Sequence, residues 1–169
     1  CPQEGQIDPL RGTAALLALV RRAGARLAGG VEVTGIARDG AGFAVDTEGG
    51  RIRAGQVVVA AGPWSGQIAA LAGVKLAVGG LVQQVIATEA TAPIIPHLVA
   101  HAGRHLSFKQ GPHGHLLIGG AWPGVHDAAT GATGNRRESI EGNLWIAGHV
   151  VPAVAGLAVL RAWTGMNVH

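Results

Sequence analysis

Cysteine and charge are both scarce in this chain, and each scarcity excludes a class of protein. The one cysteine, at position 1, rules out an internal disulfide framework. Charged residues make up only 14% of the 169 residues and the net charge of +3 is scattered, so the sequence lacks the clustered basic and aromatic face of nucleic-acid-binding proteins. Hydrophobic residues account for 48%, which excludes a disordered chain and allows one core or two small lobes.

Familiar catalytic and nucleotide-binding motifs are also missing from the sequence. It contains no P-loop, no GxGxxG and no Ser–His–Asp order, and the GAG at 40–42 lies in an expected hairpin turn. Asp127, Glu138 and Glu141 lie in polar stretches that we expect to face water. No acid/base pair can be named from them, so the catalytic residues stay unassigned.

The two ends of the sequence lead us to expect a piece of a longer protein. The start, CPQEGQIDP, begins with Cys instead of Met and lacks the charged-then-apolar order of a signal peptide. The end, TGMNVH, follows an apolar stretch without a cap or a polar tail. We therefore expect a fragment of a cytoplasmic protein, although a processed terminus would look similar.

The segment QVVVAAGPWSG, residues 56–66, has the pattern of a buried strand that runs into a helix. Residues 57–61 are β-branched or small without polar alternation, which is typical of a strand buried on both faces of a parallel sheet. Gly62 permits a sharp exit, Pro63 suits the first turn of a helix, and Gly73 is the expected helix end. Ligands bind beyond such strand ends in open α/β sheets, but a plain strand–helix corner explains the same pattern.

Glycine-bearing turns and periodic apolar residues divide the rest of the chain into two parts. The first is expected to contain a helix and then a three-stranded meander, at 12–28, 31–37, 43–47 and 51–54. The second is expected to be an antiparallel lobe with a long strand and a hairpin, at 75–90, 104–110 and 115–122. Residues 136–150 are a helix candidate, and 153–163 are expected to form a helix or a buried segment.

Two further patterns have both a functional and a structural interpretation. His97, His101 and His105 are spaced four apart, as metal ligands on a helix would be, but a proline and a glycine interrupt any helix there. Surface histidines are therefore favoured, and we predict no metal site. The weakly charged stretch 144–160 is shorter than the roughly 20 residues of a membrane-spanning helix and contains a proline, so a buried core segment is favoured.

The order of several segments resembles one protein family. These segments are GQIDPLRG, GVEVTGI, VVVAAGPWSGQIAALAGVKLAV, LVQQVIATEA, HLLIGG and LRAWTGMN. Together they resemble FAD-dependent oxidoreductases of the D-amino-acid oxidase type, which include glycine oxidases and sarcosine oxidase β-subunits, over nearly the whole chain. The resemblance implies FAD as the cofactor and a small amine or amino acid as the substrate. Its amine-bearing carbon would give a hydride to the flavin, leaving an imine that water hydrolyses.

The resemblance also implies where FAD would lie. Val33 would lie against the adenine end, and Ala60, Ala61 and Gly62 would form a wall whose small side chains let the backbone approach the dinucleotide. Similar proteins carry a GxGxxG unit upstream and a second glycine-rich, flavin-contacting segment downstream, and neither is in this sequence. We therefore expect the isolated piece to bind FAD weakly or not at all and to be inactive.

Two residues match positions near the active-site cavity of similar proteins. They are Gln84 and Trp163, for which an ordinary strand position and plain core packing remain open as alternatives. Asn167 stands where many relatives have an arginine. If that arginine binds a substrate carboxylate, its replacement speaks against an α-amino acid as the substrate.

The expected fold is α/β and α+β in three parts. Residues 1–73 are a partial, Rossmann-like FAD-binding domain with a helix, a meander and a parallel strand; 74–160 are an antiparallel-sheet substrate lobe; 161–169 return toward the FAD domain. The parent protein would be an amine or amino-acid oxidoreductase, with a possible partner subunit or peripheral membrane contact. A non-enzymatic α+β ligand-binding or interaction module, or a membrane-attached segment through 144–163, stays open as an alternative.

Overall fold

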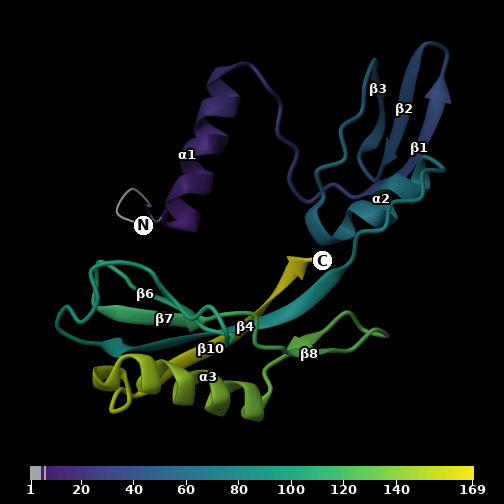
Figure 1. Cartoon of the computed structure of the whole chain (residues 1–169). Coiled ribbons are helices and arrows are strands. Elements are labelled where there is room, and N and C mark those ends of the chain that lie inside the picture. Colours follow the sequence, from purple (N-terminus) through teal and green to yellow (C-terminus); the bar gives the residue numbers. More distant parts are fainter. Residues whose placement is uncertain (1–4, 6) are drawn as a thin grey trace. The chain divides into compact units, whose positions relative to one another are not determined.

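The computed structural model describes residues 5 and 7–169, which form two compact units (Figure 1). The first unit runs to Gly79 and includes His169, and the second runs from Gly80 to Val168. The backbones of Gly79 and His169 exchange two hydrogen bonds of 2.9 Å. The division after Gly79 does not show what either unit binds. The FAD-binding, substrate-binding and return roles therefore stay predictions for residues 1–73, 74–160 and 161–169.

The first unit begins with helix α1 (Pro9–Arg22), which confirms a helix here but shifts it toward the N-terminus. The Asp8 carboxylate caps it by accepting hydrogen bonds from the backbone N–H groups of Leu10 and Arg11, and Pro9 occupies the first turn. The helix ends early because Gly24, with φ of +86°, turns the chain. No residue of α1 is buried.

The predicted meander is confirmed as an antiparallel sheet. Its strands are β1 (Val33–Asp39), β2 (Gly42–Thr47) and β3 (Gly50–Ala54), paired in that order. Ile36 and Ala44 are its buried residues. Short glycine turns join neighbours in sequence, so the pairing is local and readable from the sequence.

The predicted parallel strand at 57–61 was wrong for this structure. The segment is extended but pairs with no strand in the described part of the chain, and Val58 is 85% exposed. An apolar run favours a strand but does not supply the neighbour that a strand requires. The exit after it is confirmed: Gly62 has φ of +53° and opens a 3₁₀ turn (Gly62–Trp64) that leads into helix α2 (Ser65–Leu71).

The second unit contains the predicted antiparallel sheet, with five strands in the order β10-β4-β7-β6-β5. Their bounds are β4 (Gly80–Ala90), β5 (Val99–Ala100), β6 (Ser107–Gln110), β7 (His115–Gly119) and β10 (Val159–Val168). A two-stranded ribbon, β8 (Val125–His126) and β9 (Thr133–Gly134), leads into helix α3 (Arg137–Val150). Helix α3 was predicted at 136–150 and is confirmed.

The helix offered as one alternative for residues 153–163 was wrong. A 3₁₀ turn (Pro152–Val154) precedes β10, which pairs with β4 over nearly its whole length. This pairing provides the backbone partners that a strand needs. In the part of the chain that the structure describes, no helix is both long and apolar enough to cross a membrane.

Helix α3 covers one face of the five-stranded sheet and forms the core of the second unit with it. The buried core residues are Ile86, Leu106, Phe108, Leu116, Ile118, Ile146, Ala147 and Val154. Because side chains alternate along a strand, every second residue of β4 points into this core.

Candidate functional site

The face of the five-stranded sheet opposite α3 is the strongest candidate surface within the second unit. On β4, Gln83, Val85 and Ala87 alternate with fully buried neighbours and are half-buried. Strand register extends this face to β10, because Trp163 lies opposite Val85 and Gly165 lies opposite Gln83. We call the following strip the open face: Gln83, Val85, Ala87, Arg161, Trp163, Gly165 and Asn167.

The open face combines an aromatic ring, a bare stretch of backbone and a pair of amides. The Arg161 guanidinium lies 5.3 Å from the centre of the Trp163 ring, within the range of a cation–π contact. Next along β10, a Cβ added at Gly165 would meet no atom within 4 Å. Beyond it, the Asn167 side-chain N–H donates to the Gln83 side-chain oxygen at 3.2 Å.

The structure places the two predicted cavity residues on opposite faces of the sheet. Trp163 lies half-buried on the open face, whereas Gln84 pairs with Thr164 and is fully buried beneath α3. The Gln84 Oε1 atom accepts the backbone N–H of Arg136 at 3.1 Å, at the start of α3. Of the two adjacent glutamines of β4, the one that shares a face with Trp163 is Gln83, which the sequence did not single out.

The predicted cofactor edge consists of small residues that are at least partly exposed, which close approach of a dinucleotide requires. Ala60 is exposed, and Ala61 and Gly62 are half-buried. Val33 is half-buried at the start of β1, the strand against which α2 packs. The residues present thus fit close approach of a dinucleotide, because a larger side chain at 60–62 would block it.

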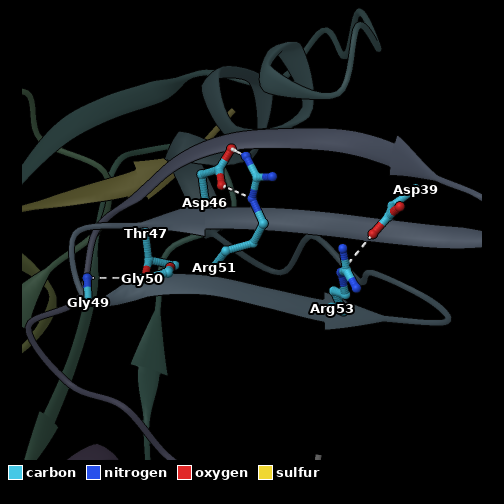
Figure 2. Close-up of polar contacts among 7 residues, drawn as sticks. All are labelled: Asp39, Asp46, Thr47, Gly49, Gly50, Arg51 and Arg53. Carbon is cyan, nitrogen blue, oxygen red and sulfur yellow. Dashed lines mark hydrogen bonds and ion pairs between the residues drawn. The ribbon is translucent and has the colours of Figure 1, made fainter.

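Two pairs of oppositely charged residues in the meander are engaged with each other (Figure 2). Arg51 Nε lies 2.6 Å from Asp46 Oδ1 across β2 and β3, and Arg53 Nε lies 2.9 Å from Asp39 Oδ2. The hydrogen bond from Arg51 lowers the pKa of the Asp46 carboxyl below its ordinary value, and Asp46 in turn raises the pKa of Arg51. These arginines therefore stabilise the meander and offer no vacant anion site.

The acidic residues predicted to face water, Asp127, Glu138 and Glu141, are exposed, and two of them make structural contacts. Asp127 accepts hydrogen bonds from the Ala129 backbone and the Thr130 hydroxyl in the turn between β8 and β9, and the hydroxyl is the main cause of its lowered pKa. Glu141 pairs with Arg137 at 2.7 Å along α3. Neither carboxylate lies on the open face.

The histidines provide no metal site in the described residues, where no group of three or more potential ligands comes together. His101 Nδ1 accepts the Gly103 backbone N–H, and His115 Nδ1 lies 2.9 Å from the Thr88 carbonyl oxygen. These contacts fix loop and strand geometry.

A surface pocket of about 460 Å³ lies beside the turn that joins β6 and β7. Its central polar side chain, Gln110, is fully used. Its oxygen accepts from Ile94, and its N–H group donates to the carbonyls of Thr91, Ala92 and Gly114. With that amide engaged in holding the turn, the pocket is a weaker candidate than the open face.

Comparison with known proteins gives a consistent family match. A family model described as FAD dependent oxidoreductase matches residues 1–168. The chain is 31% identical over 168 residues to the glycine oxidase of Geobacillus kaustophilus, covering 98% of this chain and 43% of that enzyme. It is 32% identical over 143 residues to sarcosine oxidase subunit beta of Rhizobium meliloti, covering 80% of this chain and 32% of that subunit.

Solved structures give the same result for the fold. L-proline dehydrogenase from P. horikoshii aligns with a TM-score of 0.84 and 26% identity, over 98% of this chain and 45% of that one. Glycine oxidase from Geobacillus kaustophilus aligns with a TM-score of 0.74 and 26% identity, over 92% of this chain and 41% of that one. The chain therefore spans less than half the length of the relatives that it matches.

Proposed function

Because this chain belongs to the FAD-dependent oxidoreductase family, we propose that it is part of an enzyme that oxidises a small amine or amino acid. FAD, when bound, would accept a hydride from the carbon that carries the substrate nitrogen, while that nitrogen loses a proton and a C=N bond forms. The contribution of this chain would be to bind and orient the substrate and to leave room for the cofactor.

The open face is the surface that we assign to the substrate. Trp163 would provide an apolar wall, and the Gln83–Asn167 pair would provide hydrogen bonds. Glu89, the acid that continues this face at the end of β4, accepts the Ala158 backbone N–H at 2.8 Å, and none of the residues that define the open face is an acid, so we assign no carboxylate base for a protonated amine to this face. The substrate amine would therefore have to arrive neutral, and activity should rise with pH through the pKa of the substrate.

The cofactor would lie along the edge formed by Ala60, Ala61 and Gly62. Their small side chains are consistent with close approach of a dinucleotide backbone. Val33, at the start of β1, is proposed for the adenine end.

The observation that carries this proposal is the family match, which extends over residues 1–168. The test uses the polypeptide expressed from the complete reading frame that contains these 169 residues. We expect it to purify with FAD and to oxidise at least one of glycine, sarcosine or L-proline, monitored with oxygen and with a dye as acceptor. A well-folded protein without flavin and without amine oxidation would contradict the proposal and favour a non-enzymatic binding module.

A further inference from the structure

The amide pair on the open face presents hydrogen-bond donors to a ligand. Asn167 Nδ2 donates one proton to Gln83 Oε1, and Asn167 Oδ1 accepts the backbone N–H of Val168 at 3.0 Å. Both side-chain oxygens are therefore engaged. The remaining N–H groups of these two amides have no partner among the described residues, so they match an acceptor oxygen.

The position of this pair is suited to a small ligand that also contacts an aromatic ring. Gly165 separates Asn167 from Trp163 on β10 and lies directly opposite Gln83 on β4. A side chain at this point would fill the space between the ring and the amides, whereas the glycine leaves it open. The apolar part of a ligand could therefore lie between Trp163 and the amides.

No formal charge accompanies these donors on the open face. The cation of the strip, Arg161, is six residues from Asn167 along β10, which corresponds to roughly 20 Å in an extended strand. It is also engaged with the Trp163 ring. An acceptor oxygen bound at the amide pair would therefore be held without an opposite charge beside it.

We propose that Gln83 and Asn167 bind an acceptor oxygen of the substrate through neutral amide donors, so that the enzyme takes amines bearing a carboxamide nearly as well as those bearing a carboxylate. This inference rests on the proposed oxidoreductase function. A carboxylate accepts stronger hydrogen bonds than an amide carbonyl but loses more hydration when it binds, and the two effects oppose each other. A guanidinium at the same place would select a carboxylate by charge and by its forked geometry.

The test measures binding of two unreactive ligands, methoxyacetate and methoxyacetamide, to the protein from the complete reading frame by calorimetry. We expect their dissociation constants to differ by less than tenfold. Gln83→Ala should raise the dissociation constants of both ligands at least fivefold. Asn167→Arg should shift the ratio of the two dissociation constants at least tenfold in favour of methoxyacetate. If the arginine variant does not fold, Asn167→Ala takes its place, and it should raise both dissociation constants at least fivefold.

Arg104→Gln serves as the matched control, because it removes a cation that lies over the Trp145 ring outside the open face, and it should leave both constants unchanged. Arg161→Gln tests whether the distant cation of the strip, instead of the amide pair, sets the ratio of the two constants. A wild-type preference for methoxyacetate above tenfold, binding of neither ligand, or a ratio that Arg161 alone controls would overturn the inference. FAD content and amine oxidation, measured on the same sample, report on the proposed function separately. A yellow, active enzyme with a strong carboxylate preference would refute this inference alone.

Discussion

Gln83 and Gln84 are neighbours in sequence, yet their surroundings differ completely. Gln84 is fully buried and ties β4 to the start of α3 through its hydrogen bond with the Arg136 backbone. Gln83 is half-buried, and its side chain accepts a hydrogen bond from the exposed Asn167 side chain. The same residue type therefore lies in the core at one position and on the proposed substrate surface at the next.

This difference predicts unequal stability effects for two matched substitutions. Gln84→Ala removes a buried acceptor and leaves a cavity, so it should lower the free energy of unfolding by about 2 kcal/mol or more. Gln83→Ala removes an exposed contact and should change it by less than about 0.5 kcal/mol. Urea unfolding of the 169-residue chain, followed by circular dichroism, measures both. Equal losses for the two variants would argue against the different environments assigned to them.

At the scale of elements, local signals were readable from the sequence and long-range pairing was not. The meander and the β6–β7 hairpin join neighbouring segments through short glycine turns, so their strands could be predicted. The run 57–61 has strand-like residues but no described partner, and β10 finds its partner β4 about seventy residues earlier. Gln84 was named from its match to similar proteins, and the sequence does not show which of two adjacent glutamines faces the core, because a register shift of one residue exchanges the two faces.

The meander itself carries a pH-dependent contact between β2 and β3. The Arg51 guanidinium lowers the pKa of the Asp46 carboxyl below its ordinary value of 3.8. Because the pKa is lower in the folded than in the unfolded chain, the contribution of this pair to stability is present above that ordinary value. It is lost as the pH falls through the lowered pKa.

Arg51→Gln should therefore raise the pKa of Asp46 toward 3.8, as measured by following the carboxyl carbon by NMR during an acid titration. Arg53→Gln is the control, because Arg53 pairs with Asp39 and not with Asp46. A pKa of Asp46 that responds equally to both substitutions would show that general charge, rather than the Arg51 hydrogen bond, sets its value.

At the scale of the whole molecule, the first unit has apolar surface that its own residues do not cover. Helix α1 has no buried residue, Leu10 on it is 83% exposed, and Val58 is 85% exposed in the unpaired segment. Large exposed apolar surfaces usually mark an interaction. The relatives are more than twice as long as this chain. We expect that residues corresponding to the unmatched part of these relatives would cover the exposed apolar surface of the first unit.

This expectation bears directly on the cofactor. The 169 residues contain small side chains at 60–62 but no GxGxxG or P-loop to hold a diphosphate. Most of the binding energy for a dinucleotide would therefore have to come from other sequence, and the isolated chain should not retain FAD in stoichiometric amounts.

The measurement is the ratio of flavin to protein absorbance after the isolated 169-residue chain is mixed with excess FAD and passed over a desalting column. The protein from the complete reading frame, treated identically, is the positive control and should keep about one FAD per chain. Ala61→Leu in that longer protein should lower its FAD content, because the larger side chain projects where the dinucleotide backbone is proposed to approach. An isolated chain that keeps one FAD per molecule would show that these 169 residues are sufficient to bind FAD. It would contradict the prediction that other sequence holds the diphosphate of the cofactor.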